Sequence, residues 1–599
     1  MTGGILNIRK IISVLTGLCV FTSLATRLVA QQTIDRPNVI IVLTDDQGFG
    51  DFSATGNPVL QTPHLDSLRA HSIRFSNFHV SPLCTPSRGE LMTGLDALHN
   101  GACTVGTGRD FLRRDIVTMP EVFLENGYRT GIFGKWHLGD NYPDRPMDRG
   151  FQKCIWFRGW GLLSESEFDN DYYHTRYMDS LTVVKSDKYC TDLWFDEAIH
   201  WMTRMHRDGK PFFAYIATNA PHGPLYAPRK DMAFYRDKVP DLKTAKFFGM
   251  IRDIDRNMNK LDQWMTKEQL KRNTVVVFMN DNGGTAGVDL YNAGMRGKKG
   301  SNYDGGHRAV CFVRWPEGGL AAPYTVESLA EVQDIFPTME QLCNLRPTSQ
   351  PLDGVSLVPE LKGKKGDTDR MVVVQYGGDN RPEEFDGCVL WKDWRLVGRN
   401  ELYLISHDSG EQHNLAATNP AIRDSMRAFY DRWWETLPDW DHFIPLIVGS
   451  ESENPVTLTS DYWADSQYVN TQWKVALAGG APRGGIWHVR AEQKGTYRFE
   501  LSRWPPRLRR PLSQAGPDTA EGGTRIRAGK NVPVHAGCLS IDGQNPLVGA
   551  PADERSSGVV ITTKMSKGDH TLAGWFRDGK GEDLCGAYYL KVTWVPPDR

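Results

Sequence analysis

The sequence has no excess of charge of either sign, because its 599 residues include 70 lysines and arginines against 72 aspartates and glutamates. A balance this close to neutral gives no electrostatic reason to expect nucleic acid or an anionic membrane as a partner. Hydrophobic residues make up 40% of the chain and charged residues 24%. These fractions exclude extensive disorder and a bundle of membrane helices, and they are typical of a folded soluble protein.

Long apolar runs are also missing, except at the N-terminus. A basic pair, Arg9 and Lys10, precedes an apolar segment at 11–25, and a small residue, Ala30, stands before a candidate cleavage site. This arrangement is typical of a secretory signal peptide. The run is shorter than the roughly 20 residues of a membrane span. We therefore expect residues 1–30 to be a signal peptide, the mature chain to have no membrane span, and the protein to be exported to the periplasm or secreted.

Cysteine spacing gives no support for a zinc site, because the ten cysteines include no CxxC pair. Export makes disulfides feasible. Cys19 lies in the leader, which leaves nine cysteines, and an odd number indicates that one of them has a special role. The sequence contains no internal repeat, and it leaves the disulfide pairing and the oligomeric state open.

Residues 33–350 have the pattern of an α/β domain. Apolar runs at 38–43 and 274–279 are typical of strands buried on both faces. Between them, apolar residues recur at helical spacing, as at Phe247, Met250 and Ile254. The alternation of strands and helices predicts a large, mainly parallel or mixed sheet with helices on both faces.

Two smaller regions follow. Residues 351–447 predict a small antiparallel subdomain with a closing helix at 421–437; its strands are expected at 371–375, 388–391, 394–398 and 401–405. Residues 448–599 contain alternating apolar positions and turns rich in glycine and proline, which predict an extra all-β domain, a β-sandwich. Because this tail can form its own core, we expect it to be dispensable for chemistry carried by the first region.

One string stands out, Cys84-Thr85-Pro86-Ser87-Arg88. Proline suits the first turn of a helix, so Cys84 is expected just before a helix N-terminus. Free backbone N–H groups and the helix dipole at that end favour an anion.

Acidic and amide side chains follow two of the predicted buried strands. Asp45 and Asp46 come directly after the strand at 38–43, and Asp281 and Asn282 follow the strand at 274–279. The carboxyl edge of a sheet is where α/β proteins bind ligands. Hard oxygen ligands of this kind suit Ca²⁺ or Mg²⁺ and not zinc.

Three further strings carry basic residues. They are GKWHLG at 134–139, PHGP at 221–224, and KG at 299–300 leading into YDGGHR at 303–308. Taken in their order along the chain, the six strings resemble the signature of the type I sulfatases, the formylglycine-dependent, arylsulfatase-like members of the alkaline-phosphatase superfamily. The chain departs from that pattern at Asp304, where the family more often has glutamate. Lys299 directly precedes Gly300, as the lysine of the family's K-G pair does, so Lys299 is favoured as the functional lysine. Lys298 is the alternative.

The resemblance implies a fold of the alkaline-phosphatase type and hydrolysis of sulfate monoesters. It also implies that a separate formylglycine-generating enzyme oxidises Cys84, and that the hydrated aldehyde is the nucleophile. One Ca²⁺ ion would be bound by Asp45, Asp46, Asp281 and Asn282, and would also contact the oxygen at residue 84.

The same resemblance implies roles for five basic residues. Arg88 would hydrogen-bond the nucleophile oxygen, while Lys135 and Lys299 would neutralise the sulfuryl oxygens. His222 would protonate the departing oxygen. His137 would take a proton from the second hydroxyl at residue 84.

A sulfated carbohydrate is the expected substrate, and the loop at 140–173 is the expected leaving-group pocket. Two alternatives stay open. A phosphonate or phosphodiester hydrolase shares the signature, although that subgroup tends to carry Gln at the position of Asp46 and His at the position of Asn282. A non-catalytic glycan-binding protein on the same scaffold is the other alternative.

Overall fold

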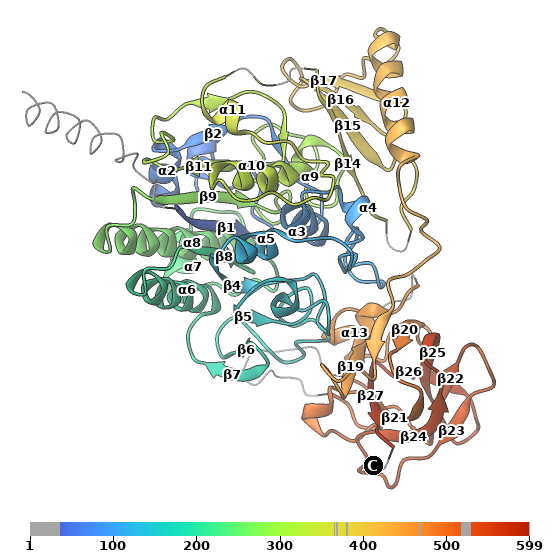
Figure 1. Cartoon of the computed structure of the whole chain (residues 1–599). Helices are drawn as coiled ribbons and strands as arrows, with labels where there is room; N and C mark the ends of the chain where they lie inside the picture. Colours follow the sequence, from blue (N-terminus) through green and yellow to red (C-terminus); the bar gives the residue numbers. More distant parts are fainter. Residues whose placement is uncertain are drawn as a thin grey trace, which may run out of the picture. The chain divides into compact units, whose positions relative to one another are not determined.

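The computed structural model describes residues 36–364, 366, 369–378, 381–465, 469–516 and 529–597. Its largest element is a ten-stranded sheet in the order β12-β2-β11-β9-β1-β8-β4-β5-β6-β7 (Figure 1). The strands are β1 (Asn38–Thr44), β2 (Ile73–Phe75), β4 (Arg129–Lys135), β5 (Lys153–Phe157), β6 (Thr175–Asp179), β7 (Thr182–Ser186), β8 (Phe212–Ala217), β9 (Thr274–Asn280), β11 (Cys311–Arg314) and β12 (Thr325–Val326).

The centre of this sheet is parallel and its flanks are mixed. Strands β9, β1, β8, β4 and β5 run parallel to one another. Strand β11 is antiparallel to β9, and β6 is antiparallel to β5. The predicted mainly parallel or mixed sheet is therefore confirmed.

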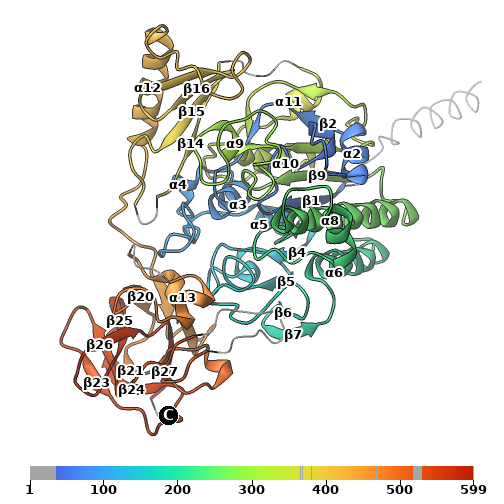
Figure 2. The same cartoon turned by 180° about the vertical axis from the view of Figure 1, so that it is seen from behind.

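Successive residues of β1 face opposite sides of the sheet, as expected for a strand buried on both faces. Val39, Ile41 and Leu43 pack with helices α3 (Cys84–Thr93), α5 (Met119–Glu125) and α10 (Ile335–Leu342). Ile40 and Val42 pack with α6 (Cys190–Arg207) and α8 (Leu242–Lys267). Helices thus cover both faces of the sheet, as Figure 2 shows from behind.

Shorter elements complete this part of the chain. A three-stranded sheet has the order β10-β3-β13. The elements are α2 (Pro63–Ala70), β3 (Phe78–His79), α4 (Ala97–Asn100), α7 (Arg229–Tyr235), α9 (Asp304–His307), β10 (Arg308–Ala309), β13 (Ala330–Glu331) and α11 (Val358–Leu361).

The second region is a four-stranded antiparallel sheet covered by one helix. Its elements are β14 (Met371–Gln375), β15 (Gly387–Trp391), β16 (Trp394–Val397), β17 (Glu401–Leu404) and α12 (Pro420–Trp434). Val389 and Leu396 of the sheet pack against Met426 and Tyr430 of the helix. All four strands were predicted within one residue, whereas the helix ends three residues earlier than predicted.

The C-terminal β region (residues 446–597) forms two sheets. One has the order β18-β20-β25-β22-β23, with β26 on β25, and the other has the order β19-β27-β21-β24. The strands are β18 (Leu446–Val448), β19 (Val456–Thr459), β20 (Trp487–Ala491), β21 (Gly495–Ser502), β22 (Ala536–Ile541), β23 (Leu547–Gly549), β24 (Val559–Met565), β25 (Gly568–Arg577), β26 (Asp583–Gly586) and β27 (Tyr589–Val595). A short helix, α13 (Gln472–Ala476), was not predicted. Val489 of the first sheet and Phe499 of the second share one hydrophobic core, as in a sandwich.

That core is not built from the C-terminal β region alone. Phe111, Leu163 and Phe168, which precede it by hundreds of residues, belong to the same cluster. Residues from Asn38 to the C-terminus accordingly form one compact unit. The domain boundaries predicted after residues 350 and 447 stay predictions.

The remaining expectations concern the signal peptide, membrane spans and disulfides. The predicted signal peptide at 1–30 lies outside the described residues, so export stays a prediction. Within the described part of the chain, no helix is long and apolar enough to cross a membrane. All nine cysteines of that part are buried free thiols, and none is in a disulfide.

Candidate active site

Four neighbouring parallel strands deliver the predicted site residues to one edge of the sheet. Asp45 and Asp46 follow β1, and Asp281 follows β9. Lys135 is the last residue of β4, and His222 lies in the loop after β8. Because β9, β1, β8 and β4 are adjacent, their carboxyl ends bring residues more than 200 positions apart together.

Glycines allow the loops after β1 and β9 to meet. A Cβ atom added at Gly48 would lie 2.5 Å from the backbone nitrogen of Gly284. One added at Gly283 would lie 2.2 Å from the carbonyl oxygen of Gly305. Only glycine permits such close approach of two backbones. The glycines of the two acidic strings and of the 303–308 string therefore hold these three segments in contact.

Cys84 is the first residue of α3, so the helix begins slightly earlier than predicted, and the whole helix is buried. Its Sγ lies 3.5 Å from Nδ1 of His137. The hydroxyl of Thr85 lies 2.9 Å from Nε2 of the same ring. Burial raises the pKa of the Cys84 thiol, although Lys135 and Lys299 oppose the shift. Without modification, residue 84 is therefore a neutral thiol at a helix N-terminus.

Carboxylates and cations alternate around this thiol. Nζ of Lys135 lies 2.7 Å from Oδ2 of Asp45, and Nη2 of Arg88 lies 2.8 Å from Oδ2 of Asp281. Burial opposes ionisation of Asp45, yet the charge of Lys135, and then those of Arg88 and Lys299, lower the pKa of that carboxyl. Burial, and then the neighbouring charge of Asp45, raise the pKa of Asp281 to about 7. The two carboxyl groups thus share one set of cations.

Lys299 reaches the site and Lys298 does not. Nζ of Lys299 lies 2.5 Å from Oδ1 of Asp46, whereas Lys298 is exposed. Burial opposes the charge of Lys299, but Asp46 raises the pKa of the ammonium group. Of the two adjacent lysines, Lys299, which directly precedes Gly300, is therefore the one that lies at the site.

The oxygen atoms fit a divalent cation. Ligand atoms of Asp45, Cys84 and Asp281 all lie within 4.8 Å of one another. Within the described residues, Oδ1 of Asp45 and Oδ1 of Asn282 are buried without a hydrogen-bond partner. A buried carboxylate or amide oxygen without a partner is costly, and a cation would satisfy both. Because both are hard oxygens, the residues present fit Ca²⁺.

His222 has a fixed orientation. Its Nδ1 donates to the carbonyl oxygen of Gly223 at 2.7 Å, which leaves Nε2 facing Asp46 at 3.8 Å. Burial lowers the pKa of His222, although Asp46 opposes the shift. His137 is also held neutral, because burial and then Lys135 lower its pKa well below 6.5.

Arg88 contacts Asp281, Lys135 and Tyr215, and its hydrogen bond to the nucleophile oxygen stays a prediction. Its guanidinium donates to Asp281, to the carbonyl oxygen of Lys135 at 3.3 Å and to the hydroxyl of Tyr215 at 3.4 Å. Among the described residues it makes no hydrogen bond to the thiol of Cys84, because the carboxylate of Asp281 is a much stronger acceptor than sulfur. Arg88 thus orients Asp281, and Tyr215 was missed because a tyrosine inside a buried strand gives no sequence signal.

Sequence reasoning also missed Trp160, which lies in the loop at 140–173. Its ring centroid is 5.4 Å from that of His222, with 53° between the ring planes. Trp160 is partly exposed. The prediction of that loop as the leaving-group pocket did not single out this residue.

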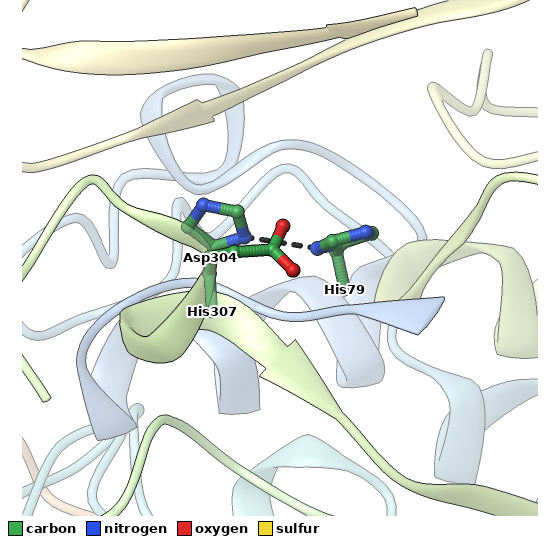
Figure 3. Close-up of side chains that lie close together, drawn as sticks. All are labelled: His79, Asp304 and His307. Carbon is green, nitrogen blue, oxygen red and sulfur yellow. Dashed lines mark hydrogen bonds between the residues drawn. The ribbon is translucent and has the colours of Figure 1, made fainter. Parts of the chain in front are cut away.

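A second buried cluster supports the string at 303–308 (Figure 3). Asp304 is fully buried between Arg308 and Arg395, whose Nε lies 2.9 Å from its Oδ1. Nδ1 of His79 lies 2.9 Å from Nδ1 of His307. Because Arg395 belongs to β16, this cluster joins the four-stranded sheet to the segment that carries Lys299.

Both ring nitrogens of each histidine have polar neighbours in this cluster. Nε2 of His79 lies 2.9 Å from Oδ1 of Asn77 and 3.2 Å from Nη2 of Arg395. Nδ1 of His79 faces Nδ1 of His307. Nε2 of His307 donates to the carbonyl oxygen of Asn302 at 3.3 Å. Burial lowers the pKa of His307 to about 4, so the ring is neutral near pH 7. With Asp304 paired to two arginines, this cluster is a structural network and not a metal site.

The α/β part of the chain, which carries the site, is similar to known sulfatases. A sulfatase family model matches residues 37–345, which is just over half of the chain. The chain belongs to the sulfatase family. The match covers every predicted site residue, from Asp45 to Lys299, and it ends before the C-terminal β region.

Individual relatives agree with this assignment. Arylsulfatase J of Mus musculus is 32% identical over 325 residues, which are 51% of this chain and 52% of that protein. N-acetylgalactosamine-6-sulfatase of Canis lupus familiaris is 30% identical over 375 residues, 57% of this chain and 69% of that protein. The chain thus spans about half the length of arylsulfatase J.

A solved structure shows the same fold. Ps i-CgsB in complex with k-i-k-neocarrahexaose is 27% identical, with a TM-score of 0.61. The similarity covers 66% of this chain and 92% of that one. The α/β sulfatase fold predicted from the sequence is therefore confirmed.

Proposed function

We propose that this chain hydrolyses sulfate monoesters of carbohydrates, with residue 84 as formylglycine and one Ca²⁺ ion beside it. The observation that carries the proposal is the position of Cys84 at the N-terminus of α3, within 4.8 Å of carboxylate oxygens of Asp45 and Asp281. The names of two similar proteins, N-acetylgalactosamine-6-sulfatase and Ps i-CgsB in complex with k-i-k-neocarrahexaose, support a carbohydrate as the alcohol part.

Asp45, Asp46, Asp281 and Asn282 would hold the cation, which would withdraw charge from a sulfuryl oxygen. The hydrated aldehyde formed from Cys84 would supply a hydroxyl group as the nucleophile. A plain serine at this position would offer one hydroxyl only, so a sulfated serine would be a stable ester. The hydrate has a second hydroxyl, and loss of its proton would expel sulfate and re-form the aldehyde.

The chain's own residues bind the sulfate and move the protons. Lys135 and Lys299 place ammonium groups beside the carboxylates, where sulfuryl oxygens would meet them. Neutral His137 lies 3.5 Å from Sγ of Cys84, the atom that the modification replaces by oxygen, and is suited to accept a proton there.

His222 is suited to give a proton to the departing sugar oxygen. With Nδ1 bound to the carbonyl of Gly223, Nε2 is the atom that would donate. The negative charge of a bound sulfate ester favours the protonated ring, which offsets the effect of burial. This assignment separates the two histidines into an acceptor at residue 84 and a donor at the leaving group.

The experiment is a screen of the chain produced together with a formylglycine-generating enzyme. Peptide mass spectrometry should find the aldehyde or its hydrate at residue 84. The panel contains N-acetylgalactosamine-6-sulfate, k-i-k-neocarrahexaose and 4-nitrophenyl sulfate, with Cys84→Ala as the control. We expect sulfate release from at least one sugar sulfate by the aldehyde-bearing protein and none by the variant. Protein with a confirmed aldehyde that releases no sulfate from any sulfate ester contradicts the proposal.

A further inference from the structure

The 158–172 loop, between β5 and β6, lies against the proposed general acid. Besides Trp160, the loop brings Gly161 close to His222, since a Cβ atom added at Gly161 would lie 3.9 Å from Nδ1 of the histidine. Nδ1 is already bound to the carbonyl of Gly223, and Nε2 faces Asp46. The loop thus packs beside the ring of the proposed general acid.

Trp160 is held by the C-terminal β region. Its indole Nε1 donates to the carbonyl oxygen of Asn470 at 2.6 Å. This hydrogen bond occupies the indole N–H, so a ligand would meet the aromatic ring of Trp160 and not its polar group. Sugar rings present C–H groups that pack on aromatic rings, and partly exposed tryptophans are common in binding pockets.

The rest of the loop pairs with the same segment. Ser164 and Thr471 form an antiparallel bridge, and the backbone nitrogen of Glu165 donates to the carbonyl oxygen of Asn470 at 3.3 Å. The backbone nitrogen of Asp169 donates to Oε1 of Gln472 at 3.1 Å. One isolated bridge and several hydrogen bonds therefore join the 158–172 loop to residues 470–472.

Side chains of the loop are also inserted into the sandwich. Phe168 is fully buried, and its ring centroid lies 5.8 Å from that of Trp504 in an edge-on arrangement. The hydroxyl of Tyr589 donates to the carbonyl oxygen of Glu165 at 2.7 Å, and Arg507 forms an ion pair with Asp169 at 2.6 Å. Without these partners the loop would lose a large part of its apolar and polar contacts.

We infer that the C-terminal β region is a structural part of the active site. It holds the 158–172 loop in place, and Trp160 on that loop is the ring on which the sugar of the substrate packs, next to His222. This inference rests on the proposed function, and it reverses the expectation from the sequence that the C-terminal region is dispensable. Trp160 is a specificity residue, and Tyr589 and Arg507 are positioning residues that act through the loop.

The test compares Trp160→Ala with Trp160→Phe, which keeps a ring but loses the N–H group. The substrates are 4-nitrophenyl sulfate and the sugar sulfate that wild type cleaves fastest in the screen above. We expect Trp160→Ala to raise KM for the sugar sulfate about tenfold, to change kcat less than threefold, and to leave inhibition by inorganic sulfate unchanged. Trp160→Phe should restore most of the affinity. Trp473→Ala, an exposed tryptophan of α13, is the control.

A second pair of variants tests the role of the C-terminal β region. Tyr589→Phe removes the hydroxyl that reaches the loop, whereas Tyr588→Phe removes one that donates to the carbonyl of Gly479 inside the region. We expect only Tyr589→Phe to raise KM for the sugar sulfate, by about two- to fivefold.

The outcomes separate this inference from the proposed function. Unchanged KM values for the sugar sulfate in Trp160→Ala, with wild type active, overturn the inference and leave the function intact. Equal losses of kcat on every substrate, with weaker inhibition by inorganic sulfate, also overturn it, because the sulfate side would then be damaged. Absence of sulfatase activity in wild type with a confirmed aldehyde refutes the function itself.

Discussion

Replacing His222 by alanine separates the chemistry of the leaving group from that of the sulfate. An aryl sulfate departs as a phenolate, whose conjugate acid has a pKa near 10, as for tyrosine. A sugar alkoxide is much more basic and needs a proton as the bond to sulfur breaks. Because Nε2 is the free nitrogen of a ring fixed through Nδ1, the variant removes this proton donor and no contact of the cations around Cys84.

The expected magnitude follows from the contribution of a general acid, about 10²–10⁴-fold. On a sugar sulfate, kcat of His222→Ala should fall by this factor, which corresponds to about 3–5 kcal/mol of transition-state stabilisation. On 4-nitrophenyl sulfate the loss should stay below about tenfold, because this leaving group needs little protonation. Steady-state kinetics of both substrates with one preparation give the ratio directly.

Two controls accompany this measurement. His206→Ala removes an exposed histidine at the end of α6 and should leave both rates unchanged. Thermal unfolding shows whether His222→Ala is folded. Equal losses on the two substrates by a folded variant would refute the role of His222 and point to His137 or to a residue outside these strings.

Three further predictions concern the metal site and the buried network. In a Cys84→Ala background, Asp281→Asn should weaken the affinity for Ca²⁺ at least tenfold by calorimetry, whereas Asp289→Asn, at an exposed position, should not. Equal Ca²⁺ affinities of the two variants would contradict the assignment of Asp281 as a ligand. Asp304→Asn leaves buried Arg395 uncompensated and should lower the free energy of unfolding by about 3–5 kcal/mol in urea titrations; a loss below about 1 kcal/mol refutes the network. The pKa of His307 falls from 6.5 to about 4 on folding, so the unfolded chain takes up a proton first as the pH drops. The free energy of unfolding should therefore decrease by about 3 kcal/mol between pH 6.5 and pH 4. In His307→Gln the free energy of unfolding should fall less steeply over the same range.

Much of the site was predictable because its residues sit on regular elements. The apolar runs before Asp45 and Asp281 identify parallel strands, and adjacent parallel strands must end at one edge. A proline two residues after Cys84 indicates the start of a helix. These signals are local, so they needed no knowledge of the three-dimensional contacts.

The features that were missed depend on long-range packing. Nothing in the sequence near Trp160 shows that its N–H group meets the carbonyl of Asn470, more than 300 residues later. Phe168 looks like an ordinary loop residue, yet it is buried in the core of the sandwich. The alternating strands of the C-terminal β region predicted its fold correctly but gave no sign that its core includes residues of the catalytic part.

The most direct test of the central claim compares 4-nitrophenyl sulfate with 4-nitrophenyl phosphate, using protein whose residue 84 carries the aldehyde. We predict a much higher kcat/KM for the sulfate ester, and complete loss of that activity in Cys84→Ala. A preference for the phosphate ester, or full sulfatase activity of Cys84→Ala, would contradict this claim.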